Sequence, residues 1–369
     1  MRHDDAPLRV QHQVPVFVQP PQRLLDPGRV EPRPAGQLRP LRRPPGLGEG
    51  PEHGQPHVLH PLVVHSCSLH SKVPRERGPK SSALVPSVVT MTQAEPSTVL
   101  VTGATGHVGR PLVAELLAAG HRVRALSRRP ERATLPAGAE VVAGDLADTS
   151  SLSTVFAGVT AVHLIGFGGD YAPLTNGSEI MDLAVRAGVR RVTVLKGETE
   201  KTALDQAVEA SGLEWTYLAP VEFMSNALEW AESVRDEGVV REAFPDVRSA
   251  MIHDADIASV AAAALTADGH AGREYWLTGP EALTAPEKAR VIGAVLGRDV
   301  RYVELGRDEI VARWREQGFS DEDVEFFLTM RTNPPEAGYT VLPTVEEVTG
   351  RPARTFAQWV RENAAAFGG

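Results

Sequence analysis

Short apolar runs alternate with longer segments of helical periodicity between residues 98 and 220. The runs are rich in β-branched residues, as buried strands are, and they cover 98–102, 122–126, 140–143, 161–165, 191–195 and 215–218. The segments between them predict helices over 108–119, from about 150 with Ser150 or Ser151 as N-cap, over 176–187 and over 200–210. This alternation predicts an α/β fold in which helices cover both faces of a parallel sheet.

Beyond Pro220 the alternation loosens, although four segments keep helical periodicity. They are "HDADIASVAAAAL", "APEKARVIGAVLG", "SDEDVEFFLTM" and "TFAQWVRENAAAF", with Asp256, Thr284, Ser320 and the pair Thr355–Gln358 as predicted caps. We therefore expect a nucleotide-binding domain over 97–220 and a smaller lobe over 221–369, some of whose elements return to the sheet.

Residues 1–90 differ from the rest of the chain. They hold 16 of the 29 prolines, 7 of the 12 histidines and the only cysteine, Cys67. Prolines at this density block helices, and the apolar clusters follow no period, so the segment is predicted to be a disordered extension. Met91 could be the natural start, which would place the segment outside the native protein. A targeting peptide is the weaker alternative, and weak metal binding by the histidines at 53–70 is weaker still.

Composition narrows the classes of function. The net charge is −9, which argues against nucleic acid or an anionic membrane as the main partner. A single cysteine excludes an internal disulfide and a cysteine-based metal site, and no apolar stretch is long enough to cross a bilayer. We expect a cytoplasmic protein that binds a small molecule.

A glycine-rich turn, "VLVTGATGHVGRPL", joins the first strand to the first helix. Gly103 would allow the tight turn, Gly106 the close approach of a diphosphate, and Gly109 the packing of helix against strand. The free N–H groups and the dipole at the start of the helix favour a phosphate. We therefore assign the cofactor diphosphate to this turn, which comprises Gly103, Thr105, Gly106, His107, Val108 and Gly109.

The end of the second strand indicates which dinucleotide binds. A cofactor with a free ribose 2′-hydroxyl usually meets an acidic residue there, but this chain has Ser127, Arg128 and Arg129. Guanidinium groups match a 2′-phosphate, so NADP(H) is favoured over NAD(H), the alternative being that these arginines form a solvated loop. Asp145 and Leu146 lie where a loop would clasp adenine, although Asp145 could equally be a turn residue.

Several motifs together resemble the NmrA-like branch of the atypical short-chain dehydrogenases/reductases. They are "VTGATGHVG", "VRALSRRP", "GDLAD", "ASGLEWTYLAP", "VEFMSNALEW" and "YWLTGPEALTAPEKARVIGAVLGRDVRYVEL", and the likeness spans about 97–369. The resemblance implies a Rossmann-type doubly wound sheet with a small C-terminal substrate lobe, and NADP(H) as cofactor. The family includes reductases of quinone type and NADP-sensing regulators with little or no catalysis.

The resemblance also identifies a departure from the superfamily. Its reductases carry Tyr-x-x-x-Lys, and the register places the lysine at Lys201, ten residues before Ser211, but puts Gly197 where the tyrosine should be. Lys201 is expected to contact the nicotinamide ribose and is a candidate proton donor, the alternative being an exposed helix lysine. Ile165 and Gly166 could pass under the nicotinamide, unless this is only a flexible loop.

Phe223, Met224 and Asn226 would line the substrate mouth if the resemblance holds. Asp256 in "HDAD" is expected to cap a helix, and no metal site is expected. The leading hypothesis is an NADP(H)-dependent oxidoreductase that passes hydride to a small apolar acceptor such as a quinone or enone. The rival is a non-catalytic NADP sensor that binds a partner protein. A sugar-nucleotide epimerase or dehydratase ranks last, and a homodimer is possible.

Overall fold

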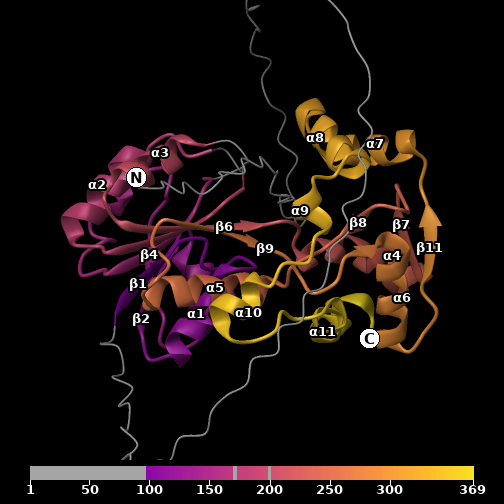
Figure 1. Ribbon diagram of the computed structural model, residues 1–369, viewed down its shortest axis with the longest axis horizontal. Helices are drawn as coiled ribbons and strands as arrows, with labels where there is room; N and C mark the ends of the chain where they lie inside the picture. Colours follow the sequence, from indigo (N-terminus) through magenta and orange to yellow (C-terminus); the bar gives the residue numbers. More distant parts are fainter. Residues whose placement is uncertain (1–96, 169–172, 198–200) are drawn as a thin grey trace, which may run out of the picture. The chain divides into compact units, whose positions relative to one another are not determined.

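A seven-stranded parallel sheet forms the centre of the protein (Figure 1). The computed structural model describes residues 97–168, 173–197 and 201–369. The strands lie in the order β3-β2-β1-β4-β5-β6-β9. Their bounds are β1 Thr98–Val101, β2 Arg122–Ser127, β3 Glu140–Ala143, β4 Ala161–Ile165, β5 Arg191–Leu195, β6 Glu214–Pro220 and β9 Arg273–Leu277. The order reverses between β1 and β4, and in such sheets ligands bind outside the carboxyl ends of the strands at that point. The predicted α/β class and Rossmann-type sheet are confirmed.

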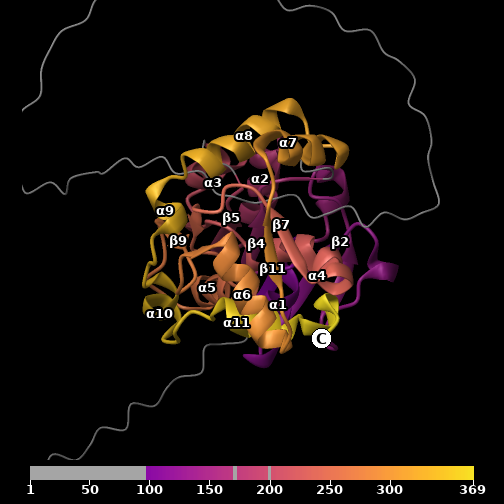
Figure 2. The same cartoon turned by 90° about the vertical axis from the view of Figure 1, so that its right-hand side faces the viewer.

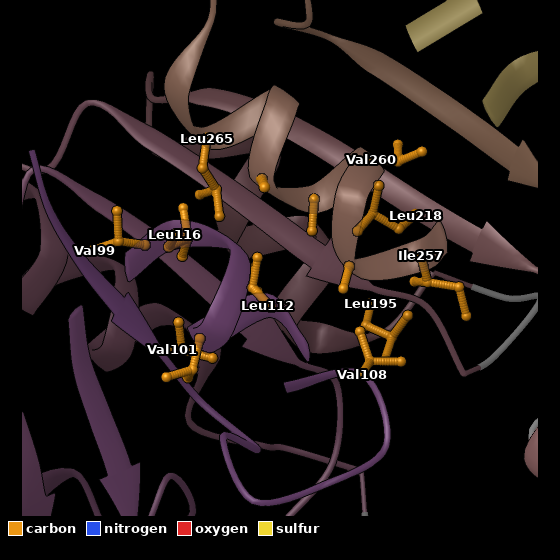
Figure 3. Packing of buried hydrophobic residues seen from close by; sticks show 14 of the residues in the cluster. Val99, Val101, Val108, Leu112, Leu116, Leu195, Leu218, Ile257, Val260 and Leu265 are labelled. Atoms are coloured by element: carbon orange, nitrogen blue, oxygen red, sulfur yellow. The ribbon is translucent and has the colours of Figure 1, made fainter. Parts of the chain in front are cut away.

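One face of the sheet is covered by two helices from distant parts of the sequence. These are α1 (Gly109–Ala118), which follows the glycine turn, and α5 (Asp254–Thr266), which belongs to the C-terminal half. Figure 3 shows their apolar side chains meeting over the strands. The labelled residues of this cluster are Val99, Val101, Val108, Leu112, Leu116, Leu195, Leu218, Ile257, Val260 and Leu265. The C-terminal half therefore contributes α5 to the core of the nucleotide-binding half and β9 to its sheet.

The other face packs against α2 (Gly177–Ala187) and α3 (Ala203–Ala210). The segment after β3 was expected to form a helix from about 150, but it forms only the short 3-10 turn η2 (Thr149–Leu152). The predicted serine caps are also wrong, because Asp148 is the N-cap and accepts a hydrogen bond from the Ser150 N–H. Serines that bond to nearby backbone groups compete with regular helix, which accounts for the difference.

The C-terminal half contributes a second layer, which Figure 2 views end-on. Two small sheets, β7–β11 and β8–β10, pack there with several helices. The elements are η4 Met224–Trp230, α4 Ala231–Glu237, β7 Val239–Glu242, β8 Arg248–Ser249, β10 Leu283–Thr284, α6 Ala285–Leu296, β11 Arg301–Glu304, α7 Arg307–Glu316, α8 Asp321–Thr332, α9 Glu336–Tyr339, α10 Thr344–Thr349, α11 Phe356–Glu362 and η5 Ala364–Phe367. The predicted caps Thr284, Ser320 and Thr355 are confirmed.

Asp256 was expected to cap α5, but it does not. His253 is the N-cap, and the buried Asp256 accepts hydrogen bonds from the backbone N–H and the guanidinium of Arg354. A second tie joins the Arg351 guanidinium to Glu115 on α1 at 2.7 Å. The segment between α10 and α11 is thus bound to both helices of the first face.

The N-terminal extension 1–90 lies outside the described residues, so its disorder stays a prediction. Within the ranges that the structure describes, no helix is long and apolar enough to cross a bilayer.

Candidate functional site

The glycine turn after β1 depends on three close backbone approaches. Gly103 has a φ of +60°, in the left-handed region that side chains rarely adopt, and a Cβ there would lie 2.9 Å from Ile165 Cγ2. The Gly106 N–H donates to the Gly103 carbonyl at 2.9 Å and closes the turn. A Cβ on Gly109 would lie 2.7 Å from Ala104 Cα and nearer still to the Gly103 carbonyl oxygen. Gly103 therefore has the predicted turn conformation, and Gly109 allows the start of α1 to approach the backbone of Gly103 and Ala104.

No side chain caps the start of α1, although the Arg110 N–H donates to the Gly106 carbonyl at 3.1 Å and Pro111 has no N–H. Its N-cap, Val108, provides no side-chain hydrogen bond, and its first turn contains no acidic residue. By contrast α3, α6, α8 and α11 each begin with a capping box. Thr105, Gly106 and His107 are exposed in front of this helix end. An exposed glycine turn before a helix start that has no side-chain cap and no acidic residue suits a diphosphate, so the residues present fit a dinucleotide.

Thr102 anchors this turn to the neighbouring strand, a role that the sequence did not reveal. Its buried hydroxyl donates to the His163 carbonyl at 2.9 Å and accepts from the Ile165 N–H at 3.0 Å. The end of β1 is thereby tied to the end of β4. A threonine between a strand and a glycine turn is the signal that could have identified it.

The arginine corner lies at the end of β2. Ser127 accepts a hydrogen bond from the Arg129 N–H at 3.1 Å, which shapes the turn. The side chains of Arg128 and Arg129 are exposed, and neither makes an ion pair with any residue that the structure describes. Arg124 on the same strand is by contrast bound to Glu140 at 3.0 Å. Within the described part of the chain, the corner thus presents two guanidinium groups that form no ion pair, as a 2′-phosphate would need.

The loop after β3 is held by its own side chains. Asp145 accepts from the Ala147 N–H at 3.0 Å, and its own N–H donates to Ser151 at 2.9 Å. The Leu146 carbonyl accepts from the Asn176 amide at 3.0 Å. Asp145 therefore has the turn role that the sequence left open, while adenine contact by this loop stays a prediction.

Ile165 and Gly166 lie at the carboxyl end of β4, at the same edge of the sheet as the glycine turn. Ile165 ends β4 and lies against Gly103, while the Gly166 carbonyl accepts from the Leu174 N–H at 3.4 Å. If these residues contact the nicotinamide, its ring would lie near the ends of β4 and β5, which are neighbours in the sheet. The contact itself stays a prediction.

Lys201 is a surface residue in this structure. Its side chain is 64% exposed, and its ammonium lies 2.7 Å from Glu209. Gly197 lies after β5, and Phe167 Cδ1, at 4.0 Å, is the nearest atom to a Cβ built on it. The contact of Lys201 with a ribose stays a prediction. The ion pair with Glu209 does not oppose it, because an exposed ion pair contributes little to stability and is easily broken.

Another lysine, Lys196, is buried at the carboxyl end of β5. Its ammonium lies 2.5 Å from the buried carboxylate of Asp205 and 5.0 Å from the centroid of the Tyr217 ring. Asp205 also accepts from the N–H and hydroxyl of Thr202, the N-cap of α3. Lys196 therefore fixes the start of α3 beside the candidate site. The sequence showed this lysine but not its partner.

The three predicted substrate residues lie in different surroundings. Phe223 and Met224 are buried in hydrophobic clusters, so direct contact with substrate stays a prediction for both. Asn226 lines a small polar cavity, and its buried amide nitrogen has no hydrogen-bond partner in the structure. Only Asn226 faces an open volume here.

This polar cavity also contains charged groups that sequence reasoning missed. Burial alone would raise the pKa of Glu222, but Lys288 and Arg331 lower it below its ordinary value. Their nitrogens lie 3.7 and 3.6 Å from the carboxylate. Burial and the charge of Glu242 raise the pKa of Glu229. The two charged residues that meet Glu222, Lys288 and Arg331, lie 66 and 109 residues further along the chain, so no local pattern could have indicated them.

A second cavity with mainly apolar walls, called the apolar groove below, adjoins the polar one. Both contain Glu222 and Arg331. It begins at Val221, directly after the last residue of β6. An acceptor bound there would lie at the carboxyl edge of the sheet, on the same side as the glycine turn.

Comparison with known sequences places the chain among NAD(P)H-binding proteins. The family described as NAD(P)H-binding matches residues 103–199. A (4-alkanoyl-5-oxo-2,5-dihydrofuran-3-yl)methyl phosphate reductase of Streptomyces griseus is 40% identical over 282 residues, which cover 73% of this chain and 99% of that protein. An NAD(P)H azoreductase of Xenophilus azovorans is 32% identical over 292 residues and covers 73% and 99%.

Solved structures share the fold. An NADPH-dependent quinone oxidoreductase of Escherichia coli, complexed with NADPH, superposes with a TM-score of 0.61 at 24% identity and covers 72% of this chain and 99% of that chain. A mutant of NmrA superposes with a TM-score of 0.56 at 19% identity, covering 72% and 95%. At these identities the likeness establishes the fold alone.

Proposed function

The chain belongs to the NAD(P)H-binding family of atypical short-chain dehydrogenases/reductases, and on this premise we propose that it is an NADPH-dependent reductase of conjugated carbonyl compounds. The observation that carries the proposal is the combination of an exposed glycine turn, two arginines that form no ion pair within the described residues, and the apolar groove at the end of β6. The relative with 40% identity adds a substrate of this chemistry, an alkanoyl-substituted oxo-dihydrofuran.

The cofactor would lie along the carboxyl edge of the sheet. The turn from Gly103 to Gly109 would hold the diphosphate, and Arg128 and Arg129 would bind the 2′-phosphate. When bound, NADPH supplies a hydride. We keep Lys201 as the proposed ribose contact, because breaking its exposed pair with Glu209 costs no more than about 1 kcal/mol.

An acceptor of this class explains Gly197. In a 4-alkanoyl-5-oxo-2,5-dihydrofuran the ring double bond is conjugated with two carbonyl groups. Addition of hydride to the far carbon of that bond leaves a negative charge that both carbonyl oxygens share, and the adjacent carbon then takes a proton from water. Such a stabilised anion needs no phenol beside it, whereas a simple ketone does. The missing tyrosine therefore narrows the acceptor class.

The test follows NADPH absorbance with three acceptors: an alkanoyl butenolide phosphate, a quinone and a simple ketone. We expect turnover with the first two and a rate at least about 10²-fold lower with the ketone. Lys201→Ala should raise the KM for NADPH, and Lys201→Arg should restore most of the affinity. Rapid turnover of the ketone would refute the proposed acceptor class.

The second candidate is a non-catalytic NADP sensor. The absence of the tyrosine at Gly197 favours it, and the NmrA fold is consistent with it. Tight binding of NADPH with no turnover of any acceptor would support the sensor over the reductase.

A further inference from the structure

The apolar groove begins where β6 ends. Val221 and Glu222 follow Pro220 directly, and the remaining walls come from Val247, from β8 and from the end of α8 through α9. Its lining residues are Val221, Glu222, Val247, Arg248, Ser249, Met330, Arg331, Pro334, Pro335 and Gly338. Figure 1 shows α9 close to the end of β6, so this groove opens at the sheet edge where the acceptor must lie.

The charged groups of the groove are already engaged. Glu222 accepts from the Ser249 hydroxyl and lies 3.6 Å from the Arg331 guanidinium. Arg248 donates to Glu287 at 3.1 Å. What the walls still offer to a ligand is therefore apolar surface.

Two exposed apolar residues follow a wall residue of this groove in the sequence. In the described part of the chain, only Val185, Tyr339 and Val341 are large hydrophobic residues with exposed side chains, at 47%, 42% and 49%. Tyr339 directly follows the wall residue Gly338, and Val341 lies two residues further. Tyr339 and Val341 thus belong to the same segment as the wall residue Gly338, whereas Val185 lies on α2.

We propose that the groove binds the alkyl chain of an acyl-substituted conjugated carbonyl acceptor. This inference rests on the proposed reductase function and names the part of the substrate that the groove selects. Each methylene that the groove buries should tighten binding about threefold until the apolar walls are covered. The protein would thus prefer long-chain acyl acceptors to short ones.

Gly338 provides a way to fill the groove. A Cβ at this position would have Pro335 Cγ, at 4.0 Å, as its nearest neighbour, and its φ is not in the left-handed region. Gly338→Leu therefore adds bulk beside another wall residue without displacing backbone. Val185→Leu is the matched control, because it enlarges an exposed apolar residue on α2, away from the groove.

The experiment uses a series of butenolides with acyl chains from acetyl to octanoyl. For each we would measure kcat/KM with NADPH and, by calorimetry, the Kd for the protein saturated with NADP⁺. In the wild type and in Val185→Leu, affinity should rise about threefold per methylene. In Gly338→Leu this increase should be lost, while the acetyl compound binds as before. Val247→Asp, in the loop before β8, should have the same effect and serves if Gly338→Leu does not fold.

Equal affinity for all chain lengths in the wild type would overturn the inference. So would an undiminished chain-length dependence in folded Gly338→Leu and Val247→Asp. If none of the series is reduced, the proposed function fails, but the Kd values still decide whether the groove binds the chain.

Discussion

The ammonium of Lys196 lies 2.5 Å from the carboxylate of Asp205, and both side chains are buried where β5 leads to α3. Asp205 simultaneously forms the capping box of that helix with Thr202. One carboxylate thus joins the end of a strand to the start of the next helix. Gly197 and Lys201, the positions where the resemblance places the Tyr-x-x-x-Lys motif, lie between these two residues in the sequence.

Removing the buried ammonium should destabilise the fold. In Lys196→Met the carboxylate of Asp205 keeps its bonds to Thr202 but loses its counter-charge, and we expect the free energy of unfolding to fall by about 3 kcal/mol. Lys201→Met removes the exposed pair with Glu209 and should change it by less than about 1 kcal/mol. Urea unfolding of the two variants compares them directly. Equal losses would show that the buried pair has no special role.

The arginine corner should discriminate between the two cofactors. In Arg128→Ala combined with Arg129→Ala, the Kd for NADPH should rise at least about tenfold, because charge-assisted bonds to the 2′-phosphate are lost. The Kd for NADH should hardly change. Fluorescence titration measures both, and Arg186→Ala, an exposed arginine on α2, is the control. Equal losses for the two cofactors would mean that these arginines do not bind the 2′-phosphate.

Gly109→Ala should disrupt the glycine turn. The added methyl would overlap the backbone of Gly103 and Ala104, so the turn must open and α1 must shift. We expect loss of detectable NADPH binding and a fall in melting temperature of several degrees. Gly306→Ala adds a methyl whose Cβ meets only the flexible Glu309 side chain, at 3.6 Å, and it should retain cofactor affinity. Normal binding by Gly109→Ala would remove the turn from the cofactor site.

His163 should make stability depend on pH. Burial lowers the pKa of this histidine to about 4, from an ordinary value of 6.5. As pH falls from 6.5 to 4, the unfolded chain takes up a proton that the folded protein does not, so the free energy of unfolding should decrease by about 3 kcal/mol over this window. The loss is complete only below the folded pKa. Urea unfolding at several pH values should show this slope in the wild type and a flatter one in His163→Gln; identical slopes would contradict the assignment.

The central strands could be predicted because both of their faces are buried, as in β1 and β4. Such strands are continuous apolar runs, and the predicted bounds 161–165 and 191–195 are those observed, whereas the largely exposed edge strand β9 was not predicted. The glycine turn was equally readable, since Gly103 and Gly109 are required by backbone geometry that is local in sequence. Local backbone geometry thus made the glycine turn predictable, although the equally local hydrogen bonds of Asp148 and the serines after β3 were missed.

The rest depends on partners that are distant in sequence. Asp256 was expected to be a cap because aspartate favours that position, but Arg354 binds it and His253 takes its place. Likewise the charge network around Glu222 joins α6 and α8 to the end of β6. No periodicity in a single segment indicates which buried charges will meet.

The sheet and its first covering layer are finished only by residues from the second half of the chain. During synthesis β9 and α5 emerge from the ribosome after η4, α4 and β7, and Arg354, which binds Asp256 on α5, emerges some 80 residues after β9 begins. A nascent chain that has reached Pro220 therefore exposes the apolar face of α1 and an unpaired β6 edge. Both features are open to non-native association until the second half of the chain has folded onto them.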